Sequence, residues 1–470
     1  MPSRTAAQPP LARRLTRLLG AQAVATDPAT LATHATDRWF ASHEPEVVVF
    51  AESAAQVSKL LRFAHRERIP VTPRGAGVGY VGGCVPSHGG IALSLARMNR
   101  IKEINFADGV AVVEPGVITG VLQAEARRAG LFYPPDPASL KECSLGGNIA
   151  TNAGGPRCLK YGVTRSYVLG LEAVLATGEI LRTGGRTHKN KTGFDLIGMF
   201  VGSEGLLGVV TEATLRVLPL PPARSSLSAS FANFRDAADA VQAVFRAGFL
   251  PAALEIADAF TLQSAREHCG RAIVPDGEGH VLIDLDGQAA SVKSEAKLLA
   301  GILQKAGALS LETAVGETAC ERLWELRRKF SESLKATGLT KLNEDIVVPR
   351  GRLVDLAEFA ADLHKRTGFP IACFGHAGDG NIHTNIMAAN YHTDAKVRKQ
   401  VDAALDELFL QVLAWGGAIT GEHGIGLAKR RWWPKAVSPV SRAVHRSLKA
   451  ALDPHGILNP GKFVQISGEQ

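Results

Sequence analysis

Short apolar runs rich in β-branched residues alternate with amphipathic stretches over residues 45–217. Strands are predicted at VVVFA (47–51), GIALSL (90–95) and VAVVEPG (110–116). Between them, QVSKLLRFAHRERI and TGVLQAEARRAG repeat apolar residues at helical spacing, and the second helix is expected to end at Gly130. VLGLEAVLATGEIL predicts a hairpin that turns at Thr177 and Gly178. The first part of the chain therefore mixes helices with short strands.

The pattern changes at LPLPPARSS (218–226), where closely spaced prolines interrupt regular structure and indicate a domain boundary. Beyond it, SLSASFANF predicts a strand, a helix follows from Asp236 to about Phe249, and ALEIAD predicts a second strand. HVLIDLDG and SVKSEAKLLAGILQKAG begin another such unit. These units predict an antiparallel sheet with helices on one face. The segment LDPHGILNPGKF (452–463) is rich in turn residues and is expected to return to the first domain.

The composition is that of an ordinary globular protein. The 470 residues are 46% hydrophobic and 21% charged, which excludes a disordered, collagen-like or coiled-coil chain. Glycine is enriched, with 48 residues, and it recurs in short clusters instead of one tract. Such clusters predict backbone that lies close to a large ligand.

The chain is basic, with 53 Lys and Arg against 45 Asp and Glu and a net charge of +8. The excess is scattered, whereas a nucleic-acid-binding protein concentrates it in a stripe, so we expect no nucleic-acid partner. The densest basic run is KRRWW (429–433). It is interpreted as a loop packed beside the active site, with docking of an acidic partner or a membrane surface as the alternative.

Cysteine usage and hydropathy indicate the compartment. The six cysteines include no C-x-x-C pair, which argues against a zinc ribbon or an iron–sulfur cluster and fits a reducing compartment. No run of 18 apolar residues predicts a spanning helix. LARRLTRLLGAQAV is interpreted as an amphipathic lead-in helix, with a transit peptide as the alternative. We expect a cytoplasmic bacterial protein, with peripheral contact to the inner membrane as a further alternative.

The first glycine cluster, PRGAGVGYVGGCVP, runs from Pro73 to Pro86. Gly77, Gly79 and Gly82 satisfy the G-x-G-x-x-G string, but a strand and no helix follows, so a Rossmann dinucleotide site is not expected. Successive glycines still expose backbone N–H groups as a nest for a phosphate. The alternative is a tight hairpin turn.

Two further glycine clusters follow. PPDPASLKECSLGGNIATNAGG (134–155) places two glycine pairs around small polar residues, a backbone suited to a flat or anionic ligand. GSEGLLGVVTEATLRVLP (202–219) is a loop that feeds a strand.

Histidines and carboxylates gather in two motifs of the second half. FGHAGDGNIHTNI contains His376, Asp379 and His383, and GEHGIG contains Glu422 next to His423. If NIHTNI is a strand, His383 can meet His376 across the turn. Two histidines and one carboxylate make a three-ligand set with open positions, for which Zn²⁺ is the commonest occupant and Mn²⁺ or Fe²⁺ are alternatives. Asp379 either orients a histidine or caps the turn, and we favour the cap.

With these segments, the sequence resembles the FAD-linked 2-hydroxy-acid dehydrogenases, which include D-lactate dehydrogenase, the flavin subunit of glycolate oxidase and D-2-hydroxyglutarate dehydrogenase. The resemblance implies an α+β fold: a two-part FAD-binding domain of the para-cresol methylhydroxylase and vanillyl-alcohol oxidase type, and a ferredoxin-like antiparallel-sheet substrate (cap) domain. The expected divisions are a helical lead-in (1–40), the FAD-binding domain (41–220), the substrate and metal cap domain (221–450) and a segment that returns to the FAD domain (451–470).

The resemblance also implies the flavin-binding residues. The expected set is Pro73, Arg74, Gly75, Ala76, Gly77, Val78, Gly79, Gly82 and Gly83; Pro137, Ser139, Ser144, Gly147, Asn148, Thr151, Ala153 and Gly154; and Gly205, Gly208, Val209 and Asn459. The first group would cradle the pyrophosphate, the second would line the isoalloxazine and ribityl chain, and the third would hold the adenine side. Some relatives attach FAD through a histidine of the first loop, where this chain has Tyr80, so non-covalent FAD is expected.

By the same resemblance, His376, His383 and Glu422 bind a divalent metal and His423 is the catalytic base. Arg327, within LWELRRKF, would clamp the substrate carboxylate, while Arg328 is expected to face solvent. Ser331, Asn343 and Asn385 would also contact the substrate. Asn343 stands where the D-2-hydroxyglutarate enzymes have lysine, which favours a monocarboxylate such as D-lactate, although Lys341 can partly replace that cation.

The expected reaction is the metal-assisted oxidation of a 2-hydroxy acid to the 2-keto acid, with hydride transfer to flavin N5. Electrons would pass to an acceptor other than oxygen: a quinone, a cytochrome or an electron-transfer flavoprotein. D-Lactate is the preferred substrate, with glycolate and D-2-hydroxyglutarate as alternatives. A non-redox enzyme like alkyl-dihydroxyacetone-phosphate synthase is a further alternative, and a homodimer is the expected assembly.

Overall fold

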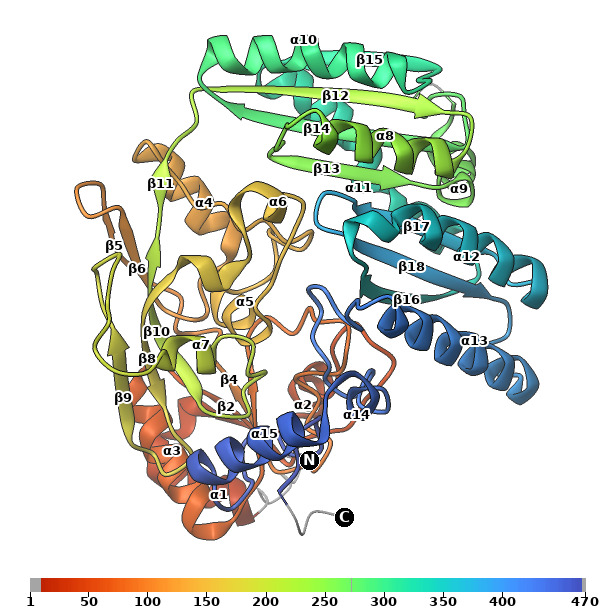
Figure 1. Cartoon of the computed structure of the whole chain (residues 1–470). Coiled ribbons are helices and arrows are strands. Elements are labelled where there is room, and N and C mark those ends of the chain that lie inside the picture. Colours follow the sequence, from red (N-terminus) through yellow and green to blue (C-terminus); the bar gives the residue numbers. More distant parts are fainter. Residues whose placement is uncertain (1–9, 272, 467–470) are drawn as a thin grey trace, which may run out of the picture. The chain divides into compact units, whose positions relative to one another are not determined.

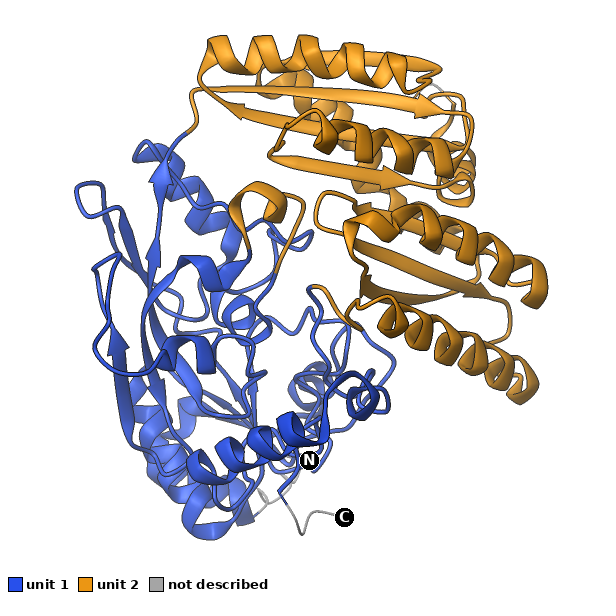
Figure 2. Ribbon diagram, viewed as in Figure 1, with its two compact units in different colours: residues 1–153, 163–220, 422–470 blue, residues 154–162, 221–421 orange. Residues whose placement is uncertain are grey.

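The computed structural model describes residues 10–271 and 273–466. The first nine residues of the expected lead-in and the last four of the expected C-terminal segment lie outside the described residues. The chain forms two compact units, shown in different colours in Figure 2. Unit 1 comprises residues 1–153, 163–220 and 422–470, and unit 2 comprises 154–162 and 221–421. The change of unit at 220 lies within the proline-rich segment, and the chain returns to unit 1 at Glu422, compared with residue 451 in the sequence-based expectation.

Unit 1 is built on two main sheets (Figure 1). The first has the order β1-β2-β4-β3, in which β4 pairs in parallel with β2 and β3. Its strands are Val24–Ala25, Val47–Phe50, Val71–Arg74 and Ile91–Ser94 for β1 to β4. The second is antiparallel, with the order β5-β6-β10-β8-β9. Its strands are Ile101–Asn105 (β5), Val110–Val113 (β6), Val168–Val174 (β8), Ile180–Gly184 (β9) and Val209–Arg216 (β10). The predicted hairpin with its turn at Thr177 and Gly178 is confirmed by the pairing of β8 with β9.

The helices of unit 1 cover these sheets with their apolar sides. α1 (Pro10–Leu19) and α3 (Ala54–Glu67) bury Leu15, Leu60 and Leu61 in one core with β2, β3 and β4. The remaining elements are η1 (Ala21–Ala23), α2 (Pro28–His34), α4 (Thr119–Arg128), β7 (Leu131–Phe132), α5 (Leu145–Thr151), η2 (Thr164–Tyr167), α7 (Leu196–Phe200), β11 (Leu218–Pro219), α14 (Trp433–Ala436) and α15 (Pro439–Leu452). The helices predicted from QVSKLLRFAHRERI and TGVLQAEARRAG are therefore confirmed.

The C-terminal segment completes unit 1. Leu458 forms a parallel bridge with Val71 of β3 and belongs to the same apolar core. The buried ammonium of Lys449 donates to Asp453 at 2.6 Å and to the carbonyl of Leu458 at 2.7 Å. Asp453 also accepts the backbone N–H of Leu458. This buried pair therefore holds the segment that contains Leu458 in place.

Unit 2 contains one seven-stranded antiparallel sheet of order β15-β12-β14-β13-β17-β18-β16. Its strands are Ala223–Phe231 (β12), Ala253–Ala257 (β13), Gly279–Gly287 (β14), Ser310–Val315 (β15), Thr340–Val347 (β16), Ile371–His376 (β17) and Asn381–Ala388 (β18). The helical elements are α6 (Cys158–Tyr161), α8 (Phe234–Arg246), α9 (Ala259–Cys269), α10 (Ala289–Lys305), α11 (Glu317–Ala336), η3 (Arg350–Arg352), α12 (Leu353–Thr367) and α13 (Ala395–Ala414). The predicted antiparallel cap sheet is confirmed.

The expectation that helices cover only one face of this sheet was wrong. The two faces of β14 contact different helices. Leu282 packs against α11, whereas on the opposite face a Cβ on Gly279 would lie 3.0 Å from Ala237 of α8. β13, β17 and β18 are buried at every position, although a sheet with one solvated face would show buried residues only at alternate positions. The sheet is therefore a central layer, with α9 and α11 packed on one face and α8 on the other.

The basic run KRRWW does not form a surface patch. Lys429, Trp432 and Trp433 are buried, and Arg431 stacks its guanidinium 4.0 Å from the Trp432 ring. This favours the packed-loop interpretation over a docking surface. Among the described helices, none is both long and apolar enough to cross a bilayer.

We predict that Asp453→Ala destabilises unit 1 by about 3–5 kcal/mol, because it removes a carboxylate that bonds the buried Lys449 ammonium. Thermal or denaturant unfolding of the purified protein measures this. The control is Glu125→Gln, which removes an exposed pair with Arg128 and should leave the midpoint unchanged. Equal midpoints for the two variants would contradict the role of the buried pair.

Candidate functional site

The candidate site lies on the face of the unit 2 sheet that packs against α11. Period-two alternation along β17 places His376 on the same face as Phe374, which belongs to the apolar cluster with Leu326 and Phe330 of α11. His383 and Asn385 share this face, because Met387 lies in the same cluster and follows them by four and two residues respectively. The sheet therefore presents a row of polar side chains beyond its apolar contact with α11.

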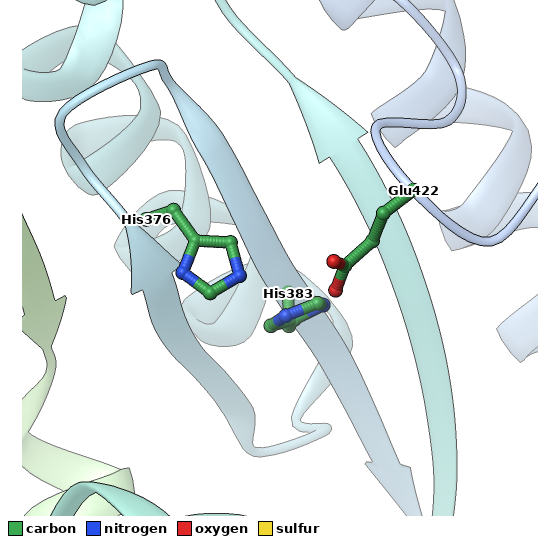
Figure 3. Close-up of side chains that lie close together, drawn as sticks. All are labelled: His376, His383 and Glu422. Carbon is green, nitrogen blue, oxygen red and sulfur yellow. The ribbon is translucent and has the colours of Figure 1, made fainter. Parts of the chain in front are cut away.

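Three candidate metal ligands converge at the end of the β17–β18 hairpin (Figure 3). His376, His383 and Glu422 each offer one ligand atom, and the three atoms lie within 4.8 Å of one another. The two imidazole rings are 5.6 Å apart and nearly perpendicular, so their nitrogens can approach one point from different directions. Two neutral nitrogen donors and one carboxylate suit a divalent transition metal with open coordination positions. The donor set of this chain thus fits the metal that the sequence predicted.

A buried carboxylate that the sequence analysis did not select orients one of these ligands. Glu255 on β13 accepts a hydrogen bond from His376 Nδ1 at 2.7 Å through Oε1. Its other oxygen, Oε2, lies 2.5 Å from Arg327 Nε. Burial alone would raise the pKa of Glu255, but the adjacent His376 and Arg327 outweigh it and lower the pKa to about 2. Glu255 is therefore ionised at neutral pH and accepts from both neighbours.

A second buried carboxylate anchors the chain that carries Glu422. Asp345 on β16 accepts the Thr420 hydroxyl at 2.8 Å and the Gly421 backbone N–H at 2.9 Å. It also accepts the Asn381 amide at 2.6 Å. A Cβ at Gly421 would lie 2.4 Å from that Asn381 side chain, so only glycine fits at this contact. Since Glu422 follows Gly421 directly, the contacts of Asp345 and Asn381 with Gly421 determine the backbone position from which the Glu422 side chain extends.

In unit 1, His423 belongs to a loop that a third buried carboxylate supports. Glu204, in the third glycine cluster, accepts the backbone N–H groups of Ile425 at 2.7 Å and Gly426 at 2.8 Å. The His423 ring stacks on Tyr80 of the first glycine cluster, with ring centres 5.3 Å apart. His423 Nε2 lies 3.8 Å from a Glu422 oxygen. The expected base therefore has its backbone and its ring both held within unit 1.

The expected substrate residues Arg327 and Ser331 lie one turn apart on α11. The Arg327 guanidinium lies 5.0 Å from the Phe374 ring centre. Ser331 accepts a hydrogen bond from Lys341 Nζ at 2.8 Å, and this ammonium lies 5.5 Å from the same ring. Burial, followed by the charges of Lys335 and Arg327, lowers the pKa of Lys341 to about 7. Two cationic side chains thus meet at one aromatic residue.

The two expected asparagines lie on neighbouring strands. Asn343 and Asn385 are direct partners across β16 and β18, and the Oδ1 atom of each is buried with no hydrogen-bond partner among the described residues. The Asn385 amide nitrogen is already bonded to the carbonyls of Ala372 and His383. Each side chain therefore retains an acceptor oxygen.

Asp379 accepts the Asn381 backbone N–H, consistent with the turn cap that we favoured, and Arg328 is exposed and paired with Glu321.

The three glycine clusters meet one another in unit 1. Ser144 of the second cluster accepts the Ala76 backbone N–H of the first at 3.2 Å, and a Cβ at Gly75 would lie 2.4 Å from that hydroxyl oxygen. Glu204 donates its backbone N–H to the carbonyl of Ala150 at 2.8 Å. The Asn459 amide donates to the carbonyls of Gly83 and Glu204, and its Oδ1 atom is buried with no partner among the described residues. A backbone cradle and a buried acceptor fit a large polar cofactor such as FAD.

The expected flavin residues lie in unit 1, apart from Gly154, which opens the short 154–162 stretch of unit 2. Two side chains have local structural partners. The Arg74 guanidinium donates to the carbonyls of Thr33 and Thr36, and the Asn148 amide donates to the Thr119 hydroxyl. Val209 packs in the apolar core. These three side chains therefore also contribute to the packing of unit 1.

Comparison with known proteins identifies the family. The model described as FAD linked oxidases, C-terminal domain, matches residues 220–463, and the model described as FAD binding domain matches residues 45–184. The chain is 38% identical to glycolate oxidase subunit GlcD of Bacillus subtilis over 419 residues, covering 89% of each protein. It is 34% identical to D-lactate dehydrogenase of Anaerostipes hadrus over 438 residues, covering 92% of each.

Solved structures agree on the fold. A p-cresol methylhydroxylase structure superposes with a TM-score of 0.80 at 20% identity, covering 98% of this chain and 97% of that one. An alkyldihydroxyacetonephosphate synthase structure gives a TM-score of 0.73 at 20% identity, covering 98% and 86%. The predicted family and two-part fold are therefore confirmed. The chain belongs to the FAD-linked oxidases and is a FAD-linked oxidoreductase of the D-lactate dehydrogenase and glycolate oxidase GlcD type.

Proposed function

We propose that the protein oxidises a D-2-hydroxy acid to the 2-keto acid in a metal-assisted reaction, with D-lactate as the preferred substrate. The observation that carries this proposal is the convergence of His376, His383 and Glu422 within 4.8 Å, followed directly along the chain by His423. Zn²⁺ is the proposed ion, with Mn²⁺ or Fe²⁺ as alternatives, because nitrogen and carboxylate donors suit all three.

FAD, the metal and the side chains would each contribute a different part of the reaction. When bound, FAD would supply a hydride acceptor, and the divalent metal would supply a Lewis acid that lowers the pKa of the substrate hydroxyl. His423 would take the hydroxyl proton, since an imidazole titrates near neutral pH and can alternate between acceptor and donor. Its stacking on Tyr80 limits the orientations of the ring. A positioned base contributes about 10²–10⁴-fold to such a step.

Arg327 would hold the substrate carboxylate. Its Nε atom is engaged by Glu255, so the two terminal nitrogens of the guanidinium are the ones that can form a bidentate contact. A carboxylate held in this way orients the α-carbon hydrogen, which is the positioning contribution to catalysis. The contact of Arg327 with Phe374 restricts the guanidinium further.

Lys341 favours a second candidate, a hydroxy acid with two carboxylates such as D-2-hydroxyglutarate. No carboxylate among the described residues pairs with Lys341, whose ammonium is held by the Ser331 hydroxyl beside the Phe374 ring. A partly buried cation without a counter-ion is unfavourable unless a ligand supplies the charge. A second substrate carboxylate would supply it.

The remaining parts of the proposal concern electron transfer and assembly. Electrons would leave to a quinone, a cytochrome or an electron-transfer flavoprotein, and the protein would be a cytoplasmic homodimer with non-covalent FAD. The six free cysteines agree with a reducing compartment.

We predict that the purified protein shows a flavin absorption band that D-lactate bleaches under anaerobic conditions. Glycolate and D-2-hydroxyglutarate, added separately, rank the substrates by rate. A flavin band that no 2-hydroxy acid bleaches, in protein with its metal restored, would instead favour non-redox chemistry of the alkyl-dihydroxyacetone-phosphate synthase kind.

We predict that His423→Ala lowers turnover by about 10²–10⁴-fold, because the hydroxyl proton loses its acceptor. Bound FAD, measured from the visible spectrum, should remain unchanged. His445→Ala is the control, since His445 lies on α15 and packs against Trp433. Turnover of His423→Ala within a few-fold of the wild type would refute the assignment of the base.

We predict that Lys341→Met lowers kcat/KM for D-2-hydroxyglutarate by about 10–100-fold, the loss expected for one charged hydrogen bond, and changes that for D-lactate little. Because Lys341 has a pKa of about 7, it is a cation below that pH and neutral above it. The preference of the wild type for the dicarboxylate over D-lactate should therefore fall as pH rises through 7. Lys297→Met, which removes an exposed lysine of α10 that does not act on the pKa of Lys341, is the control. An unchanged preference in Lys341→Met would eliminate the dicarboxylate candidate.

A further inference from the structure

We propose that Glu255 is a positioning residue that couples the metal site to the carboxylate clamp by holding His376 with one oxygen and Arg327 with the other. This inference rests on the proposed metal-assisted function and adds a residue to it. Glu255 would contact neither the metal nor the substrate. Its role would be to determine which nitrogen of His376 faces the metal and which nitrogens of Arg327 face the substrate.

Each of the two carboxylate oxygens of Glu255 bonds a different side chain. Oε1 receives His376 Nδ1 at 2.7 Å, and Oε2 receives Arg327 Nε at 2.5 Å. The side chains of Glu255 and His376 are 2% and 5% exposed, so water does not compete for these bonds. The sheet imposes the first contact, because the pairing of Ile256 with Gly375 continues to bring Glu255 opposite His376. Helix α11 imposes the second by placing Arg327 over the same strands.

The bond to Glu255 selects one tautomer of His376. Because Oε2 of Glu255 pairs with the Arg327 guanidinium, Oε1 is a carboxylate oxygen that accepts, and Nδ1 of His376 carries the proton in this bond. Neutral His376 then has its lone pair on Nε2, the nitrogen that would coordinate the metal. A carboxylate behind a metal-binding histidine also fixes the ring plane and strengthens the donor. The set of His376, His383 and Glu422 thus depends on a residue 121 positions upstream of His376.

The same carboxylate determines which nitrogens of Arg327 can reach a substrate. Because Nε is bonded to Glu255, the guanidinium plane is set and its terminal edge points away from that bond. The ring of Phe374, 5.0 Å from the guanidinium carbon, limits rotation about this bond. A movement of Glu255 would therefore displace a metal ligand and the substrate clamp together, which is the coupling that we infer.

Glu255→Gln separates this role from a merely structural one. The amide has a single acceptor oxygen, and if that oxygen stays with Arg327, the amide N–H₂ faces His376 Nδ1. Two donors cannot share a hydrogen bond, so His376 is driven to the tautomer protonated at Nε2, which has no lone pair for the metal. The expected result is a rise of about 10–100-fold in the dissociation constant for Zn²⁺. The Co²⁺-loaded variant should also show an altered visible d–d spectrum.

The experiment uses the full-length flavoprotein, stripped of metal and titrated with Zn²⁺ and Co²⁺, with FAD content and melting temperature recorded for every variant. Asp284→Asn is the matched control. Asp284 is a buried carboxylate of the same sheet that bonds Arg224 and Trp324 and none of the candidate site residues. Arg327→Met should raise KM for the hydroxy acid and should raise the metal dissociation constant less than Glu255→Gln does, because it spares the His376 bond but removes the other partner of Glu255.

The outcomes separate the inference from the proposed function. A folded Glu255→Gln variant that binds metal as the wild type does, with an unchanged Co²⁺ spectrum, overturns the inference alone. A wild type that binds neither ion and reduces its flavin without them overturns metal assistance and the inference with it. Loss of metal affinity in Glu255→Gln together with its retention in Asp284→Asn supports the coupling. Should Glu255→Gln fail to fold, Glu255→Asp tests the positioning role alone, because it keeps two acceptor oxygens on a side chain that is one methylene shorter. The dissociation constant for Zn²⁺ should then rise, and a wild-type value for both ions would overturn the inference.

Discussion

The antiparallel pairing of β17 with β18 is the constraint on which the candidate site depends. The hairpin places His376 and His383 on one face, and the neighbouring strands add Glu255 on one side and Asp345 on the other. A slip by one residue in this register would turn the histidines toward the opposite helices and separate them from Arg327. Burial of the whole sheet between helices makes such a slip unfavourable, so the fold that stabilises unit 2 also sets the geometry of its polar residues.

Buried carboxylates have a common role in this protein. Glu255 holds two side chains, Asp345 holds the segment before Glu422, and Glu204 holds the segment after His423. None of the three is among the candidate metal ligands, and each accepts more than one hydrogen bond. A carboxylate buried in this way stabilises one arrangement of its donors over others, because each donor left unpaired would cost about 1–3 kcal/mol. The residues of the candidate site thus lie on chain segments that have little freedom to move.

The sequence predicted those parts of the site that are close together along the chain. His376 and His383 lie on one hairpin, and GEHGIG and the glycine clusters are local motifs with recognisable chemistry. Glu255 and Asp345 were not predicted, because their roles arise from strand pairings that no local pattern encodes. An acid inside the apolar strand ALEIA was the one signal that could have indicated Glu255, since a charge in a buried strand requires partners. The helices on the second face of the sheet were missed for a similar reason: a fully buried antiparallel strand has no alternating pattern.

The return of the chain to unit 1 has a consequence for biosynthesis. Val71 of β3 pairs with Leu458, and Gly83 of the first glycine cluster is bonded to Asn459, so these segments acquire their partners only after residues 458 and 459 have been synthesised. Every residue of unit 2 has been made by Gly421. Unit 2 is therefore able to fold during translation before the N-terminal strands of unit 1 have paired with the C-terminal segment. Pairing between segments so far apart in the sequence slows folding. The flavin half of the protein would then mature last, although it begins first.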